Sequence, residues 1–539
     1  MDHSFNQSSK AEFGDASTTY VDAKDADYEL DAVYETTVAE KHRGTITDQH
    51  DMQVLGRVQE LRRNFGFMSI IGFGSTLICT WEFVLAGALT SSLHNGGTAG
   101  LFWGYIVVVF AFFLIYASLA EMAAMAPTSG GQYHWVSEFS PMSCQKYLSY
   151  LTGWVCFLGW QSALVGAAFL VGTMSQGLIT LNVPSYEPQP WHGTLFVIAV
   201  GFLTVFFNTF LAKRLPFVEG IMLILHVVGI FPIMIPLWVL APRNNSRAVF
   251  TEFTNNGGWP TDGVSFMVGL NAIVVSLLGF DSSVHMSEET KNAARTLPRS
   301  IMWSTCLNSL LGLAMVITIC YTIGDIDSVL ETETGYPFIQ IFYNTTQSLA
   351  GASVMTVVII LTILASTIAT TASASRQIWS FARDKGVPFS STISRVTPGW
   401  NIPVNSVIIS LVVVILLSLI NIGSTAALNA LFTLGGGSLI TSYTLCIGCL
   451  VSKRLRGEPL PPRPWSLGRY GLAINIGAIL CLLMLFVWSF FPAATPVEPS
   501  TMNWGCLIYG SVILFSTVYY LIIGRKVYTP PLEKVRRQF

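Results

Sequence analysis

Residues 276–289 read SLLGFDSSVHMSEE, and this stretch places ionisable side chains directly after a long apolar run. Asp281, His285 and Glu288 follow at i, i+4 and i+7, so on a helix they would share one face. A charge near the centre of a lipid bilayer costs at least about 2.5–3.5 kcal/mol on insertion scales. Charges retained at such a place indicate a functional site, provided that the run crosses a membrane.

The composition indicates a protein with many membrane spans. Of the 539 residues, 52% are hydrophobic and only 11% are charged, whereas soluble domains carry about 25% charged residues. Apolar runs long enough to cross a hydrocarbon core of about 30 Å predict an all-α polytopic membrane protein with twelve transmembrane helices. These runs lie near residues 66–91, 99–125, 148–178, 193–211, 216–241, 264–287, 301–324, 352–375, 404–422, 425–450, 470–493 and 503–524.

The basic residues predict the orientation of these spans. With the N-terminus inside, only Arg243 and Arg247 among the 29 Lys and Arg residues fall in outer loops, as expected because cytoplasmic loops are enriched in Lys and Arg. Both termini are therefore predicted to be cytoplasmic. Two N-x-S/T triplets, at Asn244 and Asn344, also fall in outer loops and are candidate glycosylation sites.

The two ends of the chain differ from its apolar middle. The first 60 residues are rich in Asp, Glu, Ser and Thr, which is typical of a disordered acidic tail. Lys10, Lys24 and Lys41 in this tail are candidate sites for the ubiquitin-ligase machinery. The three predicted regions are a cytoplasmic tail 1–60, a twelve-span domain 61–525 and a cytoplasmic C-tail 526–539.

Two similar segments indicate an internal repeat. Residues 70–77 read IIGFGSTL and residues 277–284 read LLGFDSSV, in spans 1 and 6, which cross the membrane in opposite directions. Chance similarity between two patches of small residues is the alternative. Helices interrupted at corresponding places in inverted repeats point to a transporter site. A half-helix N-terminus suits a carboxylate and freed carbonyls suit an ammonium, so the pair fits a zwitterion or a cationic amine.

Three longer motifs, in this order along the chain, carry a family resemblance. They are LAEMAAMAPTSGGQYHWVSEFSP (119–141), GFDSSVHMSEETKNAARTLP (279–298) and SRQIWSFARDKGVP (375–388). Over roughly residues 60–525 the chain resembles the amino acid–polyamine–organocation transporter superfamily, and within it the fungal amino acid/choline branch, which includes GABA and choline permeases. Two positions depart from the family pattern: span 1 has GFGST (72–76) in place of the usual G-S-G-I-F, and Ala293 replaces a proline.

The resemblance implies a LeuT-like 5+5 inverted repeat with broken spans 1 and 6. The implied parts are repeat one at about 66–241, repeat two at about 264–450, and extra spans at 470–493 and 503–524. Substrate would lie at mid-membrane between the two breaks. The implied binding residues are Gly72, Phe73, Gly74, Ser75 and Thr76 in span 1, with backbone N–H groups for a carboxylate; Leu278 and Gly279, with carbonyls for an amine; Phe280 and Asp281; and Trp160, Gln161 and Leu434 as pocket walls.

Two ionisable residues within predicted spans are candidates for coupling transport to protons. His226 in span 5 stands where related proton-coupled carriers have a Lys, and an imidazole with an unperturbed pKa of about 6.5 suits a proton switch. A His that is only hydrogen-bonded at a helix interface is the alternative. Asp281 is a candidate gating or proton-coupling carboxylate, and Glu288 is expected at a solvated or ion-paired helix end. No further ligands accompany Asp281, His285 and Glu288, so no metal site is predicted.

The predicted function is secondary active transport, driven by the proton gradient without a cofactor. The imported substrate would be an amino acid, a GABA-like compound or a choline-like amine. A transporter-like nutrient sensor with little flux is the alternative, whereas no H-E-x-x-H, nucleophile elbow or P-loop supports an enzyme. We expect a small-molecule substrate and the lipid bilayer as partners, no nucleic acid, and a place in the plasma membrane, with the vacuolar membrane as the alternative.

Overall fold

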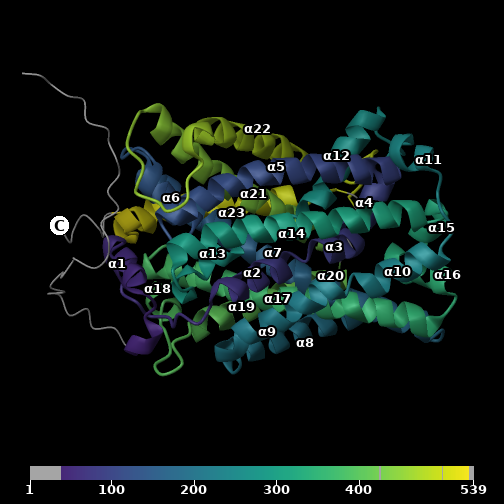
Figure 1. The fold of residues 1–539 in the computed structure, drawn as a ribbon, viewed down its shortest axis with the longest axis horizontal. Coiled ribbons are helices and arrows are strands. Elements are labelled where there is room, and N and C mark those ends of the chain that lie inside the picture. Colours follow the sequence, from purple (N-terminus) through teal and green to yellow (C-terminus); the bar gives the residue numbers. More distant parts are fainter. Residues whose placement is uncertain (1–37, 424–426, 500–501, 533–539) are drawn as a thin grey trace, which may run out of the picture.

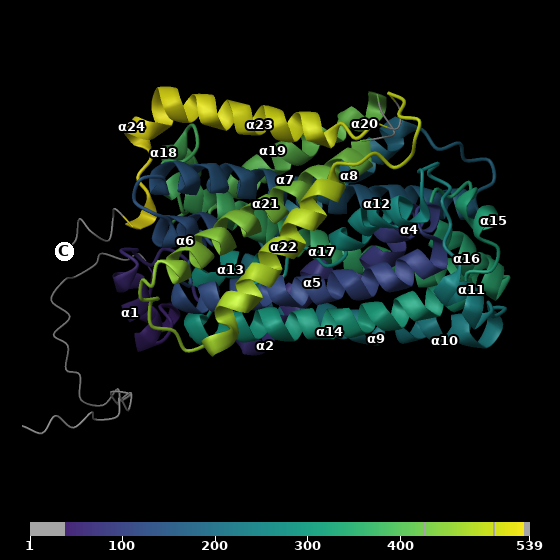
Figure 2. The ribbon, with the colours of Figure 1, turned by 90° about the horizontal axis from the view of Figure 1, so that it is seen from above.

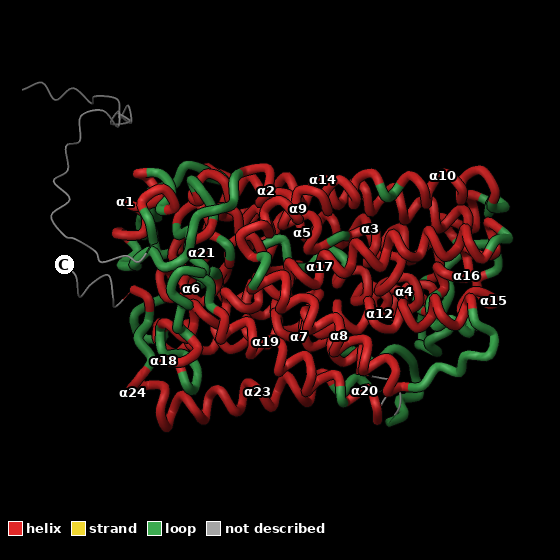
Figure 3. The backbone as a smooth tube through the Cα atoms, turned by 90° about the horizontal axis from the view of Figure 1, so that it is seen from below, coloured by secondary structure: helices red, strands yellow, loops and turns green. Residues whose placement is uncertain are grey.

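The computed structural model describes residues 38–423, 427–499 and 502–532. Long helices run side by side along the longest axis of the molecule (Figure 1). Loops gather mainly at the two ends of this bundle, and the described residues contain isolated β-bridges but no strand (Figure 3). The all-helical class predicted from the sequence is therefore confirmed.

Ten helical stretches in the described residues are long and apolar enough to cross a membrane. They are Phe67–His94 (α2 to α4), Gly97–Met125 (α5), Gln145–Asn182 (α7), Pro190–Thr209 (α8), Ala212–Leu240 (containing α9, Leu215–Val228, and α10, Phe231–Leu240), Ala293–Thr322 (α14), Leu349–Arg383 (α17), Ala430–Leu455 (in α21, Ala427–Leu455), Gly468–Ser489 (containing α22, Gly471–Ser489) and Gly505–Val527 (containing α23, Gly505–Tyr519, and α24, Arg525–Val527). Two shorter apolar helices, Asp262–Val275 (α12) and Val404–Ser418 (α19), fall in the remaining two predicted spans.

Short helices cover the two ends of the bundle. At one end lie α1 (Ile46–Val54), α6 (Gln132–Phe139) and α18 (Ser390–Ile393), and at the other α11 (Ser246–Thr251), α15 (Ile326–Leu330) and α16 (Pro337–Thr346) (Figure 1). We call the first the α1 end and the second the α16 end. The short helix α20 (Ile420–Gly423) lies further into the bundle. Figure 2 shows α23 along one edge of the bundle and α22 running obliquely across it.

The first long stretch is not one continuous helix. Helix α2 (Phe67–Ile78) ends at Cys79, whose φ of 31° and ψ of 62° lie in the left-handed region. A non-glycine residue held there carries roughly 1–3 kcal/mol of strain. The chain then continues as α3 (Thr80–Phe83), a π-helical turn (Val84–Ala88) and α4 (Leu89–His94). The break in span 1 therefore lies at Cys79, after the predicted segment 70–77.

The second break lies in the stretch SLLGFD. Helix α12 ends at Val275, residues 276–281 are turns, and helix α13 (Ser282–His285) follows. Gly279 has a φ of +117°, and a Cβ there would lie 3.0 Å from Ile78 Cδ1. Only glycine adopts this backbone without strain, so the glycine allows the chain to turn close to the end of α2.

Regular structure begins nearer to the N-terminus than the composition predicts. Residues 38–60 include a 3₁₀ turn (Glu40–His42, which contains Lys41) and α1, so the prediction of a disordered tail over 1–60 is wrong for 38–60. The rest of that tail, with Lys10 and Lys24, lies outside the described residues. Composition missed this order because the stabilising partners are distant in sequence.

Asp48 provides the main anchor of this N-terminal region. Its carboxylate, 1% exposed, accepts hydrogen bonds from the backbone N–H groups of Asn292 (2.8 Å) and Ala293 (3.0 Å) at the start of α14. It also lies 3.3 Å from the buried guanidinium of Arg63. A carboxylate at a helix N-terminus satisfies free N–H groups and opposes the positive end of the helix dipole.

The C-terminal residues also pack against the α1 end. Tyr528 is buried and its hydroxyl lies 2.7 Å from Ser149 Oγ, while Thr529 N–H donates to the Asp384 carbonyl at 3.2 Å. The predicted C-tail 526–539 is therefore docked up to Leu532, and residues 533–539 lie outside the described residues.

We expect Asp48→Ala to lower the free energy of unfolding by about 3–5 kcal/mol, the range for removing one partner of a buried ion pair. The loss arises because Arg63 keeps a buried charge and α14 loses its cap. A tryptophan-fluorescence melt of purified protein measures it. Asp51→Ala, one turn further along α1 and without these bonds, is the matched control, and equal melting of the two variants would contradict the anchoring role.

Candidate functional site

A small cavity lies where the two helix breaks meet. Its volume is about 50 Å³. Leu77 and Ile78 line it from just before the first break, Phe83 from just after it, and Leu278 from within the second. The other lining residues are Trp160, Ala163 and Ala167 on α7, Val275 on α12, Ser366 and Thr370 on α17, and Leu431, Phe432, Gly435, Gly436 and Leu439 on α21. The cavity is mostly apolar, as small-molecule sites usually are.

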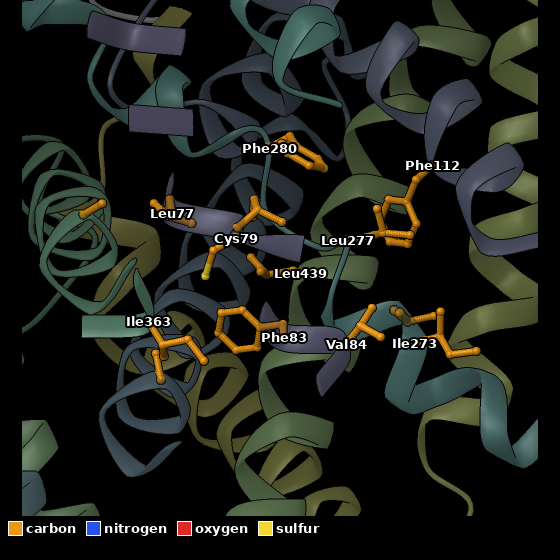
Figure 4. Close-up of a cluster of buried hydrophobic side chains, with 14 of the residues drawn as sticks. Leu77, Cys79, Phe83, Val84, Phe112, Ile273, Leu277, Phe280, Ile363 and Leu439 are labelled. Carbon is orange, nitrogen blue, oxygen red and sulfur yellow. The ribbon is translucent and has the colours of Figure 1, made fainter. Parts of the chain in front are cut away.

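The close-up in Figure 4 shows how the first break reaches the second. Leu77, Cys79 and Phe83 follow one another along the first break, with Leu439 of α21 beside them and Leu277 on the side of the second break. Helix α7 packs against both α17 and α21, which fixes the remaining walls of the cavity.

A second, wider cavity opens on the side of the α16 end. Its volume is about 680 Å³, and it shares Val275 and Phe432 with the small cavity. Its lining mixes apolar and polar side chains, among them Thr90, His94, Gln176, Asn271, Glu333, Tyr336 and Asn503. We call it the vestibule. The vestibule leads towards the small cavity, and Val275 and Phe432 stand between the two.

The glycine and hydroxyl residues of span 1 lie within α2 rather than at its break. Gly72 packs against the backbone of α9, since a Cβ there would lie 3.0 Å from the Glu219 carbonyl oxygen. Thr76 donates to Glu219 Oε2 at 2.5 Å, and Ser75 donates to Ser304 Oγ at 3.1 Å. Helical hydrogen bonds occupy the backbone N–H groups along this segment.

Phe73 and Gly74 likewise serve helix packing. The Phe73 ring meets Phe65 edge-on at 5.7 Å between centroids, and a Cβ on Gly74 would lie 3.1 Å from Ser304 Oγ. Neither residue lines the cavity. The expectation that residues 72–76 offer free N–H groups is therefore wrong. Instead, Trp81 and Glu82, in the first turn after Cys79, have N–H groups without helical acceptors in the described residues.

Trp160, Gln161 and Leu434 have three different environments. Trp160 lines the cavity, and its ring meets the His285 ring edge-to-face at 5.3 Å between centroids. Gln161 turns away and donates to Ser410 Oγ on α19 at 3.0 Å. Leu434 is buried outside the cavity, while the adjacent Gly435 and Gly436 line it.

Of the residues at the break in span 6, Leu278 lines the cavity and Gly279 and Phe280 do not. The Leu278 carbonyl accepts no hydrogen bond from the described residues. Gly279 donates its N–H to the Tyr116 hydroxyl at 2.8 Å. Phe280 points away from the cavity and meets the Tyr116 ring edge-on at 5.2 Å between centroids.

Asp281 belongs to a buried polar cluster on the α1 side of Trp160. Its carboxylate accepts hydrogen bonds from the Gln132 amide and the Tyr443 hydroxyl. His285 Nε2 lies 3.9 Å from this carboxylate, and His285 Nδ1 lies 3.0 Å from the Ser129 carbonyl. Since a carbonyl can only accept, Nδ1 carries a proton and Nε2 faces Asp281.

His226 pairs with an acid next to the first break. Its Nδ1 lies 2.8 Å from Glu82 Oε1, and both side chains are buried, at 1% and 0% exposure. The indole N–H of Trp81 donates to the His226 carbonyl at 3.1 Å. Glu82 Oε2 and His226 Nε2 have no hydrogen-bond partner in the described residues. The pair therefore links α9 directly to the short helix that follows Cys79.

Comparison with known proteins identifies the family. A profile described as amino acid permease matches residues 65–513, most of the chain. The chain belongs to the amino acid permease family. It is 28% identical to a choline transporter of Saccharomyces cerevisiae over 468 residues, covering 86% of this chain and 82% of that protein. It is 27% identical over 503 residues to an amino-acid permease of Arabidopsis thaliana, covering 90% of this chain and 96% of that protein. The chain is thus a transporter-family protein and not an enzyme.

Ion pairs join the C-terminal part of α17 to the segment before α2 and to the residues after α13. Arg57 binds Asp384 through two hydrogen bonds of 2.7 and 2.6 Å, and Tyr133 donates to the same carboxylate at 2.9 Å. Burial alone would lower the pKa of the Arg57 guanidinium, but the facing Asp384 raises that pKa above its usual range. The pair therefore stays charged.

Two further pairs belong to this set. Arg383 donates to Glu288 Oε1 at 2.6 Å, and Arg376 donates to Glu289 Oε1 at 2.8 Å. Glu288 is thus ion-paired and does not join Asp281 and His285. None of these paired residues lines the small cavity, whereas the vestibule shares Val275 and Phe432 with it.

The two candidate glycosylation sites lie towards the α16 end. Asn344 is exposed on α16, and its side-chain oxygen accepts a hydrogen bond from Gln340 at 2.8 Å. Asn244 is half-buried and donates to the Cys320 carbonyl at 3.2 Å. Glycosylation of both residues stays a prediction.

Sequence reasoning missed most of the cavity wall. Ser366 and Thr370 belong to the small-residue run STIATTASAS (366–375), and their spacing of four would have placed them on one helix face. Phe83 and Phe432 carry no comparable signal, because a phenylalanine in an apolar run is equally typical of a lipid-facing position.

We expect Gly436→Val to reduce substrate uptake about tenfold or more, because the added side chain would take up space in the cavity, and one methylene in a pocket is worth about 1–3 kcal/mol of binding. Gly436 lines the cavity, and a Cβ added to it would meet only Leu278 Cδ2, at 4.0 Å. Gly448→Val on the same helix, where a Cβ would meet open space, is the matched control. Equal uptake by both variants at equal surface expression would show that substrate does not use this cavity.

Proposed function

We propose that this permease is a proton-coupled importer that works by alternating access. The observation that carries the proposal is the cavity between two helix breaks, reached from the vestibule and sealed towards the α1 end by Arg57–Asp384 and its neighbouring pairs. A site open to one face and closed to the other is what a carrier needs, provided that a second state reverses the two closures.

The proposed topology has twelve spans in a 5+5 inverted repeat. Repeat one would comprise α2 to α4, α5, α7, α8 and α9 with α10, and repeat two α12 with α13, α14, α17, α19 with α20 and α21, leaving α22 and α23 as extra spans. The α1 end carries most Lys and Arg residues, which supports a cytoplasmic location for both termini. We place the protein in the plasma membrane, with the vestibule facing outside.

Substrate recognition would combine backbone groups and aromatic rings. The free Leu278 carbonyl and the rings of Phe83, Trp160 and Phe432 are suited to a primary or quaternary ammonium. The N–H groups of Trp81 and Glu82 begin a half-helix, which suits a carboxylate. We therefore propose an amino acid, a GABA-like compound or a choline-like amine, and similarity to the yeast choline transporter supports the amine.

The Glu82–His226 pair is the proposed site of proton coupling. A protonated His226 would form an ion pair with Glu82 and hold the half-helix after Cys79 against α9. A neutral His226 would leave the buried Glu82 carboxylate without a compensating charge, which favours a rearrangement of span 1. Asp281, which lies 3.9 Å from His285, is the second candidate. Protonation of its carboxylate would change the hydrogen bonds next to the break in span 6.

We expect His226→Ala to abolish pH-driven accumulation of substrate while exchange across the membrane continues. Without the imidazole, Glu82 loses the one side-chain hydrogen-bond partner that it has among the described residues. Counterflow and net uptake, measured in the same vesicles with and without an imposed pH gradient, separate the two activities. His192→Ala serves as the control, since His192 contacts Tyr186 at the α16 end. Full concentrative uptake by His226→Ala would exclude this coupling role.

The function itself is tested by uptake in a permease-deficient yeast strain. We expect uptake of at least one labelled compound among amino acids, GABA, choline and polyamines, and faster uptake at pH 5 than at pH 7.5. Surface expression is checked by microscopy of a tagged protein. Absence of uptake at normal surface expression would contradict the importer, and ligand-dependent signalling without flux would favour a nutrient sensor.

A further inference from the structure

Both helix breaks free backbone polar groups inside the bundle, where no bulk water can satisfy them. An unsatisfied N–H or carbonyl in such a place costs several kcal/mol, so each break needs a partner from elsewhere in the fold. Ser366 of α17 donates to the Leu77 carbonyl, and the other partners come from two long helices that are themselves unbroken, α5 and α14.

The first break is held by Asn308 of α14. Its side-chain oxygen accepts the backbone N–H of Thr80, the first residue after Cys79, at 3.1 Å. Its amide nitrogen donates to the Ser304 carbonyl one turn earlier in α14, at 3.1 Å. This second bond fixes which end of the amide faces Thr80. Asn308 is fully buried.

The second break is held by Tyr116 of α5. Its hydroxyl donates to the Leu277 carbonyl at 2.7 Å and accepts the Gly279 N–H at 2.8 Å. One hydroxyl thus satisfies backbone groups on both sides of Leu278, whose own carbonyl stays without a partner in the described residues. The contact between the Tyr116 and Phe280 rings fixes the position of the hydroxyl further.

Helices α5 and α14 are also fixed to each other. The Tyr105 hydroxyl of α5 donates to the Ser309 carbonyl of α14 at 3.1 Å, next to Asn308. At Gly312 the two helices approach so closely that a Cβ would lie 2.1 Å from the Tyr105 hydroxyl oxygen. Movement of either helix is therefore transmitted to the other, because packed helices resist shear.

We propose that Tyr116 and Asn308 form a cross-repeat clamp, in which the second helix of each repeat positions the broken helix of the other. The clamp rests on the inverted repeat proposed above. Tyr116, in repeat one, holds the break of span 6, and Asn308, in repeat two, holds the break of span 1. Both are positioning residues: they do not line the cavity, but they bond backbone groups next to Leu278 and between Ile78 and Phe83, which do line it.

The clamp has a direct consequence for substrate binding. Tyr116 bonds the Leu277 carbonyl and the Gly279 N–H, so the Leu278 carbonyl is the group that remains available to a ligand. Asn308 accepts the Thr80 N–H, so the N–H groups of Trp81 and Glu82 are the ones in this turn that remain without an acceptor in the described residues. Because α5 and α14 move together, one rearrangement would change both sets of groups at once.

Hydrogen–deuterium exchange tests the clamp without knowledge of the substrate. We expect Tyr116→Phe to speed exchange about tenfold or more in peptides covering 276–281 and not in those covering 79–83, and Asn308→Leu to do the reverse. Asn308→Asp, which keeps an acceptor for Thr80, should restore most of the protection at 79–83. Equal acceleration at both breaks, or none at either, would overturn the proposal.

Two matched controls separate the clamp from general packing. Tyr147→Phe on α7 loses its contact with Thr517 Oγ1, and Asn208→Leu on α8 loses a bond to the Ile368 carbonyl. Neither should speed exchange at a break, and a tenfold effect of either would contradict the clamp. With a transported substrate in hand, Tyr116→Phe should raise KM about tenfold and change the maximal rate less, because the ligand-facing carbonyl loses its position. A fall in maximal rate alone would contradict the positioning role.

The exchange measurement also separates this proposal from the proposed function. If no compound is taken up but each variant loosens only its own break, the importer is wrong and the clamp stands. If uptake is normal in wild type and the breaks do not respond selectively, the clamp is wrong and the importer stands.

Discussion

A backbone N–H or carbonyl without a partner inside a bilayer is too costly to persist, and the architecture of this permease depends on that constraint. Most of the chain meets it by forming continuous helices such as α5 and α14. The chain departs from helix at Cys79 and at 276–281, and there side chains from other helices supply the missing partners. The groups that remain unsatisfied, such as the Leu278 carbonyl, lie where the cavity forms. The proposed binding site is thus a place where the backbone keeps a polar group without a partner in the described residues.

The same constraint governs the charges. Burying an ion costs several kcal/mol unless a partner lies beside it, and many of the buried acids and bases lie in pairs. Arg57 with Asp384 closes the side towards the α1 end, and His226 with Glu82 joins α9 to the first break. Most of the paired charges lie between the cavity and the α1 end, which leaves the vestibule as the approach. In the proposed carrier, the distribution of charge and the direction of access would therefore be one feature of the fold.

Sequence patterns predicted local secondary structure well and predicted contacts between distant residues poorly. Summed hydropathy located the helices, and the glycine in LLGFDSS lies in the break of span 6, because both signals reside in a few adjacent residues. The segment IIGFGSTL was wrongly predicted to contain a break, because glycine and hydroxyl residues are equally common where helices pack closely. Gly72 packs on Glu219, and Ser75 donates a hydrogen bond to Ser304. The acidic composition around Asp48 predicted disorder, because its partners, Asn292 and Arg63, are invisible to a local average.

The amino-acid sequence by itself determined the all-helical class, the approximate positions of the membrane helices, the family and the break around Gly279. These follow from hydropathy, from short motifs and from the one backbone position that only glycine tolerates. Tertiary structure alone decided that span 1 breaks at Cys79, that Glu82 meets His226, and that Tyr116 and Asn308 reach the two breaks. Each of these contacts joins residues more than a hundred positions apart. Their formation depends on how whole helices pack, and no local pattern records that geometry.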